Sequence, residues 1–144
     1  MKIQIRELAE GEYASAVTLM QLLEPELSAQ VIAERSASMR TEGWVCIGVF
    51  SGSEMLGLAG YSLRTHLFSG RVMFVENVVL VPTARGKGIG EQLMKWLEEK
   101  ALALSCRMLT LDAYARNLGA RTFYQRLAYD PRGVHFVKEL SPAQ

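Results

Sequence analysis

Short segments of the chain alternate between apolar and polar residues, which is the pattern of a half-buried β-strand. The alternation about Ile3 and Ile5 predicts a first strand near the start of the chain. The turn residues Ser69 and Gly70 separate two long runs of this kind, which predicts a hairpin. Altogether the pattern predicts strands over residues 2–7, 44–50, 54–64, 71–81, 107–114 and 133–140.

Other segments repeat apolar residues every three to four positions, the period of a helix with one buried face. Pro25 separates the first two of these segments, and Ser28 is a residue type that favours a helix N-cap. Helices are predicted over residues 13–23, 28–40, 88–105 and 117–127. The resulting order, βααβββαβαβ, predicts an α/β fold with a mixed, mostly antiparallel sheet flanked by helices.

Length and composition favour one domain over residues 1–144. The chain is 49% hydrophobic and 22% charged, with a net charge of +1. A balance so close to neutral gives no broad basic surface, so no nucleic-acid partner is expected. No apolar run reaches the roughly twenty residues of a membrane-spanning helix, so no membrane partner is expected either.

The two cysteines, Cys46 and Cys106, lack the spacing of metal ligands or of a redox pair. Both fall in apolar surroundings of the predicted strands and helix ends. We therefore expect buried free thiols, a cytoplasmic protein and no metal site.

Three glycines, Gly86, Gly88 and Gly90, stand at alternate positions between a predicted strand and a predicted helix. Glycines allow the backbone to approach a ligand closely, and a helix start offers unpaired N–H groups and a positive dipole end. The combination indicates a pyrophosphate site. No Ser or Thr follows Lys87, and the glycine spacing is not Gly-x-Gly-x-x-Gly, which excludes two common nucleotide loops.

At these residues the chain resembles the GNAT family of N-acetyltransferases, and within it the small-molecule amine acetyltransferases. Arg85, Gly88 and Gly90 match the family signature Gln/Arg-x-x-Gly-x-Gly/Ala. A second motif, Asn-x-x-Ala-x-x-Phe-Tyr-x-x-x-Gly-Phe/Tyr, is matched from Asn117 onward, with Ala128 where Gly is usual. The likeness covers about residues 42–140 and implies a single N-acetyltransferase domain that uses acetyl-CoA.

The resemblance also implies which residues hold the cofactor. Main-chain groups of Val78, Val79 and Leu80 would meet the pantetheine arm, and the Val78 N–H would contact the oxyanion. Asn117 would hydrogen-bond the cofactor, cap its helix, or do both. The pyrophosphate would lie against the loop residues Arg85, Gly86, Lys87, Gly88, Ile89, Gly90 and Glu91. The two cations of this loop either contact phosphate or stay solvated, since backbone N–H groups suffice.

Two residues are candidates for proton transfer. Tyr124, in the second motif, would protonate the leaving thiolate, and its alternative is an ordinary packed tyrosine. Glu76 lies among apolar strand residues, where burial would raise the pKa of a carboxylate toward that of a base. Its alternative is a structural pairing with Arg64 or Arg71. The histidines His66 and His135 are weaker candidates for lining an acceptor site.

The sequence thus predicts acetyl transfer to a primary amine, by direct attack in a ternary complex. Resemblance favours a small-molecule acceptor of the polyamine or aminoalkylphosphonate kind, and a homodimer. Glu24 and Glu26 would attract a cationic amine or simply solvate a helix end. A protein N-terminus or lysine remains open as acceptor, and so does a non-catalytic module that binds or senses acyl-CoA.

Overall fold

The computed structural model describes residues 2–142. They form two compact units that divide between Leu111 and Asp112. The strands are β1 (Gln4–Glu7), β2 (Val45–Ser51), β3 (Glu54–His66), β4 (Gly70–Leu80) and β5 (Met108–Leu111). The helices are η1 (Glu10–Glu12), α1 (Tyr13–Leu23), α2 (Ala29–Thr41), η2 (Pro82–Ala84), α3 (Ile89–Ala103) and α4 (Leu118–Arg126).

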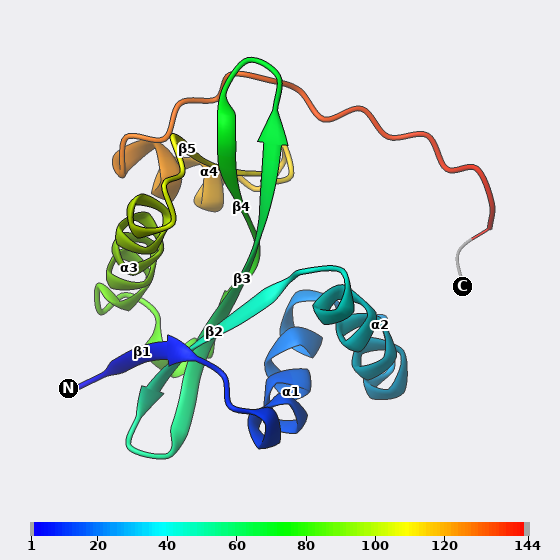
Figure 1. Cartoon of the computed structure of the whole chain (residues 1–144). Coiled ribbons are helices and arrows are strands. Elements are labelled where there is room, and N and C mark those ends of the chain that lie inside the picture. The colour runs from blue at the N-terminus through cyan, green and yellow to red at the C-terminus, as the bar shows by residue number, and fades with distance from the viewer. Residues whose placement is uncertain (1, 143–144) are drawn as a thin grey trace. The chain divides into compact units, whose positions relative to one another are not determined.

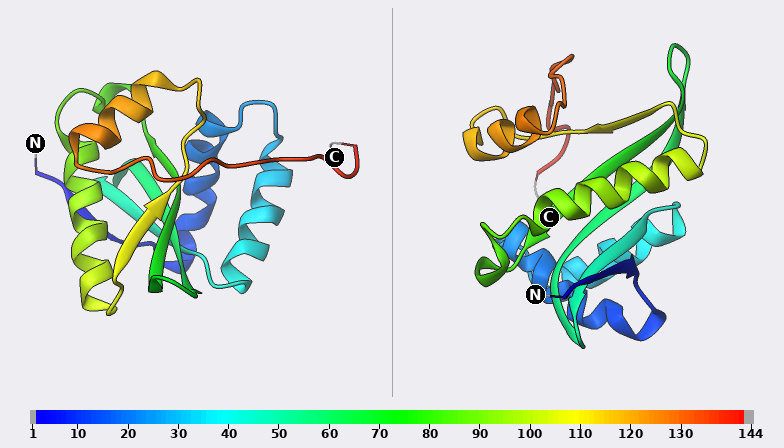
Figure 2. Two further views of the ribbon diagram at one scale, coloured as in Figure 1. Left: turned by 90° about the horizontal axis from the view of Figure 1, so that it is seen from above. Right: turned by 90° about the vertical axis from the view of Figure 1, so that its left-hand side faces the viewer.

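Within the described residues, the first unit holds one five-stranded sheet in the order β1-β2-β3-β4-β5. Neighbouring strands run antiparallel except for β4 and β5, which pair in parallel from Val72–Met108 to Val75–Leu111. Helix α3 lies on one face of this sheet, and α1 and α2 lie on the other (Figure 1, Figure 2). The predicted fold class, a mixed and mostly antiparallel sheet flanked by helices, is confirmed.

The strand predicted over residues 133–140 is wrong, because the structure has no strand there. Val134, Phe136 and Leu140 are 78%, 91% and 90% exposed. Alternation of apolar residues gives a segment the side chains of a strand, but a strand also requires a neighbouring backbone to complete its hydrogen bonds. The segment has no such ladder within the described residues.

The helix before β2, α2, starts where its sequence predicts. Ser28 is the N-cap of α2, and its hydroxyl accepts a hydrogen bond from the Val31 N–H at 3.2 Å, as predicted. On the other face of the sheet, α3 buries Leu93, Met94 and Leu97 completely. These positions follow the helical period, so α3 is anchored by its apolar stripe and its N-terminal turn is held in place.

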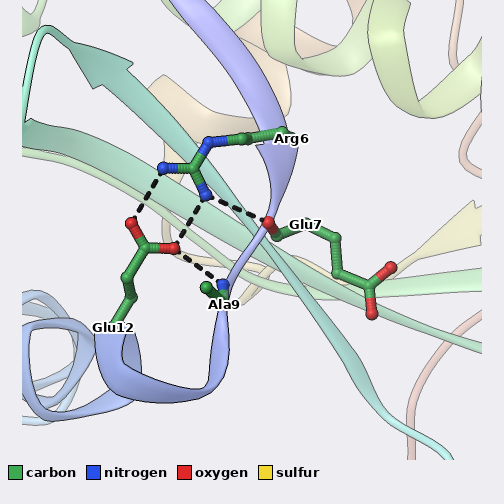
Figure 3. A network of polar contacts seen from close by, with 4 residues as sticks. All are labelled: Arg6, Glu7, Ala9 and Glu12. Carbon is green, nitrogen blue, oxygen red and sulfur yellow. Dashed lines mark hydrogen bonds and ion pairs between the residues drawn. The ribbon is translucent and has the colours of Figure 1, made fainter.

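A short ion-pair network connects β1 to the start of α1 (Figure 3). The Arg6 guanidinium donates to both carboxylate oxygens of Glu12, at 2.7 and 2.8 Å. The Ala9 N–H donates to Glu12 Oε1 at 2.7 Å. These hydrogen bonds lower the pKa of Glu12 to about 2, the bond from Arg6 contributing most. The bidentate pair fixes the direction in which the chain leaves β1.

Both cysteines are buried free thiols, as predicted. Burial raises the pKa of the Cys46 thiol to about 12, so this sulfur stays protonated and unreactive.

None of the helices in the described residues is both long and apolar enough to cross a membrane.

Candidate cofactor and catalytic site

A β-bulge interrupts β4 immediately after Glu76. The pairs on either side of the bulge are Leu58 with Val79 and Gly60 with Glu76. Asn77 and Val78 therefore both stand opposite Ala59. Asn77 has φ 63°, in the left-handed region that Asn tolerates better than most residues. Such a bulge bends its strand and turns the following backbone away from regular pairing.

The ladder between β4 and β5 ends close to this bulge. Its last pair is Val75 with Leu111. Within residues 2–111, no strand therefore continues beside the β5-facing edge of Val78, Val79 and Leu80. This edge carries the main-chain groups that the family resemblance assigns to the pantetheine arm. An uncovered edge offers unpaired N–H and C=O groups to an extended ligand.

The glycine loop lies between η2 and α3, and its backbone is exposed. Gly86 and Gly88 have φ 74° and 76°, and a Cβ built on either would meet no atom within 4 Å. Gly88 is the N-cap of α3 and makes no side-chain cap hydrogen bond. The first N–H groups of the helix, at Ile89, Gly90 and Glu91, thus have no side-chain cap.

The loop is held at both ends. The Arg85 Nε–H donates to the Leu80 carbonyl at 3.3 Å, which folds the loop back on the end of β4. At the other end Ile89 is 3% exposed and anchors α3. Lys87 between them is exposed. Open backbone N–H groups, a positive helix end and nearby cations fit a pyrophosphate, and the adjoining strand edge fits the rest of a coenzyme A molecule.

Glu76 is half-buried and faces the side of the sheet that α1 covers. This direction follows because Glu76 pairs directly with Gly60, and directly paired residues point to the same face. The Gly60 face is covered by Trp44, which belongs to the core cluster with α1 residues. One residue named as its structural alternative, Arg64, places its guanidinium 4.0 Å from the centre of the Phe74 ring.

The second unit carries Tyr124 and Asn117 on α4. The Asn117 Oδ1 accepts from the Ala120 N–H at 3.0 Å, so Asn117 caps the helix. Tyr124 is half-buried and contacts Phe123 and Tyr129 edge-on, with ring centres 5.1 and 5.9 Å apart. Burial raises the pKa of Tyr124, so its hydroxyl keeps its proton well above neutral pH.

The weaker candidates are all at the surface or at helix ends. His66 ends β3 and is exposed. His135 Nδ1 lies 3.4 Å from Asp112 Oδ2, and both side chains are largely exposed. Burial, and then a hydrogen bond with Glu26, raises the pKa of Glu24 at the end of α1. The described residues contain no group of three or more His, Cys, Asp and Glu side chains arranged to hold a metal ion.

Sequence reasoning missed two residues of this region. Asn77 forms the bulge, and Trp44 covers the sheet beside Glu76. A signal existed for the second of these, because Gly60 interrupts a strand and an isolated strand glycine indicates close approach of another group. The bulge had only a weak signal, because Asn is depleted in strands and tolerates a positive φ, yet a single Asn in an apolar run does not specify a bulge.

Comparison with known proteins defines the class. The sequence profile of the Acetyltransferase (GNAT) family matches residues 5–129. An aminoalkylphosphonate N-acetyltransferase of Salmonella typhimurium is 28% identical over 88 residues, 60% of this chain and 57% of that enzyme. A thialysine N-epsilon-acetyltransferase of Bos taurus is 26% identical over 140 residues, 87% of this chain and 82% of that enzyme. The solved structure of AAC(6')-Iy with the bisubstrate analogue CoA-S-monomethyl-acetylneamine matches with a TM-score of 0.83 at 17% identity, covering 98% of this chain and all of that one.

The chain therefore belongs to the acetyltransferase (GNAT) family, as its two motifs predicted. By that membership it is an acetyltransferase. The matched region spans little more than half the length of the Salmonella relative, 57%. The likeness to AAC(6')-Iy, at 17% identity, concerns the fold alone.

Proposed function

We propose that the chain is a single N-acetyltransferase domain that transfers an acetyl group from acetyl-CoA to a primary amine of a small molecule. The amine attacks the acetyl group directly, with both substrates bound. The observation that carries the proposal is the continuity of two features. Within residues 2–111 no strand pairs with the outer edge of β4 after Val75, and β4 leads through a glycine loop into an α3 N-terminus without a side-chain cap.

The cofactor residues act mainly through their backbone. In the proposal, N–H groups from Gly86 to Glu91 bind the pyrophosphate, and the exposed Lys87 adds positive charge. Arg85 holds the loop against Leu80, a role supported by its 3.3 Å hydrogen bond. The main chain of Val78 to Leu80 aligns the pantetheine arm. Asn117 keeps its capping hydrogen bond and orders the start of α4, with cofactor contact as a second role.

Acetyl-CoA, when bound, supplies an activated thioester carbonyl. Glu76 removes a proton from the incoming ammonium, which frees the lone pair for attack. The Val78 N–H, turned by the bulge, stabilises the oxygen that becomes negative. Tyr124 donates its proton to the departing thiolate, and its raised pKa favours the protonated form needed for this step. The nitrogen loses its second proton as the amide forms, and that proton returns to Tyr124, so the net proton released is the one that Glu76 took.

The acceptor is proposed to be a small cationic amine of the polyamine or aminoalkylphosphonate kind. Relatives support this class, since one is named for aminoalkylphosphonates and another for thialysine, an amino acid with a side-chain amine. The carboxyl pair Glu24 and Glu26 would add attraction for a cation. A lysine side chain or a protein N-terminus is the second acceptor class to test.

We propose a cytoplasmic enzyme, because Cys46 and Cys106 are free and a cytoplasmic protein keeps thiols reduced. We also propose a homodimer, on family resemblance. Light scattering of the purified chain tests the assembly, and a monomer at micromolar concentration would contradict it.

The test of the activity is a panel of amines with acetyl-CoA, followed by release of free thiol. The panel should contain diamines, aminoalkylphosphonates, thialysine and lysine peptides. Turnover of a small amine establishes the activity. Turnover of peptides alone would move the acceptor to proteins, and tight coenzyme A binding without any turnover would favour a sensing module.

The role of Glu76 as the base is tested by comparing wild type with Glu76→Gln, using the amine from the panel that is turned over fastest. We expect kcat/KM to fall most near neutral pH and the loss to shrink as pH approaches the pKa of the amine, because neutral amine then enters the site directly. Coenzyme A affinity should be kept, since Gln preserves the shape of the side chain. Parallel pH–rate profiles offset by less than about threefold would contradict a base.

A further inference from the structure

One buried hydrogen-bond donor in the first unit has no partner in the described structure. Trp44 is 4% exposed, and its indole Nε1 makes no hydrogen bond. Trp44 lies in the apolar cluster with Ala16, Leu19 and Met20 of α1. Buried N–H groups are nearly always paired, because an unpaired one has lost its bonds to water without replacement. The exception therefore requires an explanation.

The position of the Trp44 Nε1 donor is fixed by its packing against the sheet. A Cβ placed on Gly60 would fall on the edge of the indole ring, and the atom it would meet first is Nε1. The indole thus occupies the volume of the missing side chain. Trp44 also fixes its backbone, since its N–H donates to the Met39 carbonyl at 2.9 Å. Ring and main chain together hold Nε1 at a fixed point on this face of the sheet.

That fixed point lies beside Glu76. Gly60 is the direct partner of Glu76 across β3 and β4, so the glutamate side chain rises from the sheet next to the ring that covers Gly60. The following residue, Asn77, contributes a second buried atom without a partner, its Oδ1. The sheet thus has one unpaired donor on the face of Glu76 and one unpaired acceptor on the residue that follows Glu76 in the chain.

We infer that Trp44 Nε1 is the fixed donor of a water position beside Glu76, through which the proton of the acceptor amine reaches the carboxylate. The water oxygen accepts from Trp44 and donates to Glu76 and to the Asn77 Oδ1, and these three partners suffice for a buried water. The inference rests on the proposed function, in that Glu76 is the base.

The proton transfer balances. An N–H bond of the substrate ammonium breaks and its proton joins the water, while an O–H bond of the same water breaks and its proton joins Glu76. The amine becomes neutral, the carboxylate becomes a carboxylic acid, and the water is restored. Trp44 exchanges no proton and keeps the oxygen oriented, so it is a positioning residue. The N–H is the only donor that the Trp44 ring offers to this water. Without it, the water could rotate and lose its alignment with Glu76.

The test replaces the donor and keeps the ring. The first variant is Trp44→Phe. The second uses a Trp96→Phe background, in which Trp44 is substituted by benzothienylalanine, an isostere with sulfur in place of the N–H. We expect kcat/KM for the amine to fall about tenfold at neutral pH in both, the loss of one oriented hydrogen bond. The loss should shrink as pH rises, and coenzyme A affinity should be unchanged.

Two controls isolate the effect. Trp96→Phe alone, on α3 at the opposite face of the sheet, should keep wild-type kinetics. The isostere preserves packing, so a loss of activity there cannot come from a cavity. Wild-type kinetics in the isosteric variant, or a loss that is equal at every pH, would overturn the inference.

Failure of this inference and failure of the proposed function give different results. If Glu76→Gln is impaired while the isostere is not, the base stands and the water position is wrong. If no amine is turned over, a crystal structure of the coenzyme A complex decides. A water within hydrogen-bonding distance of Trp44 Nε1 and Glu76 supports the inference, and its absence overturns it.

Discussion

The Tyr129 N–H donates to the Tyr124 carbonyl at 3.0 Å and closes the C-terminal end of α4. A second bond runs from the Ala128 N–H to the Gln125 carbonyl, also at 3.0 Å. The two bonds form a Schellman motif, which requires a left-handed residue between them. Ala128 is that residue, with φ 69°. This explains why the family motif usually has glycine here, and it identifies a strained position beside the candidate acid.

Ala128→Gly should therefore stabilise the chain. A left-handed alanine costs about 1–2 kcal/mol relative to the right-handed form, and glycine removes most of that cost. We expect the free energy of unfolding to rise by about 1 kcal/mol in urea denaturation. The matched control is Ala120→Gly inside the same helix, which should lower it by about 0.5–1 kcal/mol. Equal effects of the two glycines would contradict the strain.

Tyr124→Phe keeps the aromatic ring and removes the proton donor. A general acid typically contributes ~10²–10⁴-fold, so we expect kcat to fall by about that factor while coenzyme A affinity stays nearly unchanged. The control is Tyr129→Phe, because Tyr129 contacts Tyr124 edge-on and is of the same residue type. It should retain most of the activity. Full activity in Tyr124→Phe would reassign this residue to packing.

The Arg6–Glu12 pair should make stability depend on pH in acid. The pKa of Glu12 is lowered from 4.5 to about 2 in the folded chain, so the folded state binds its proton less readily than the unfolded state. The stabilisation is therefore complete above about pH 4.5 and is lost as pH falls toward about 2.

The measurement is the melting temperature of wild type and Glu12→Gln across that range. Wild type should melt higher at pH 6, and the difference should close on acidification. It should also narrow in 1 M salt, where the screening length is about 3 Å. A difference that does not change with pH would show that the pair contributes through packing alone.

Local patterns predicted most of the elements, because the residues that define them are neighbours in sequence. Helix α1 occupies the predicted residues, and the cap of α2 is the predicted Ser28. The segment 133–140 shows the limit of this reasoning. Its alternation of Val134, Phe136 and Leu140 satisfies the side-chain pattern, yet pairing depends on a distant backbone that the pattern does not contain.

The candidate site likewise has one part that local sequence predicts and one part that it does not. The glycine loop could be predicted because Gly86 and Gly88 must adopt positive φ locally. The bulge at Asn77 and the position of Trp44 over Gly60 could not, because both depend on the register between strands. Register is set by the whole sheet, so the surroundings of Glu76 became visible only in the folded chain.

The glycine loop gives the last prediction. Gly88 is the N-cap of α3, its φ is 76°, and the space beyond its Cα is open. A side chain there would enter the space proposed for the pyrophosphate, and a carboxylate would also repel it. Gly88→Glu should abolish coenzyme A binding in calorimetry while the circular dichroism spectrum is kept.

Gly88→Gln is the matched control, since it has nearly the same size without the charge. It should bind coenzyme A weakly but measurably, because backbone strain and bulk remain while the repulsion is gone. The difference between the two variants should shrink at high salt, as a charge effect must. Unchanged affinity in a folded Gly88→Glu would remove the pyrophosphate from this loop, and with it the observation on which the proposed function rests.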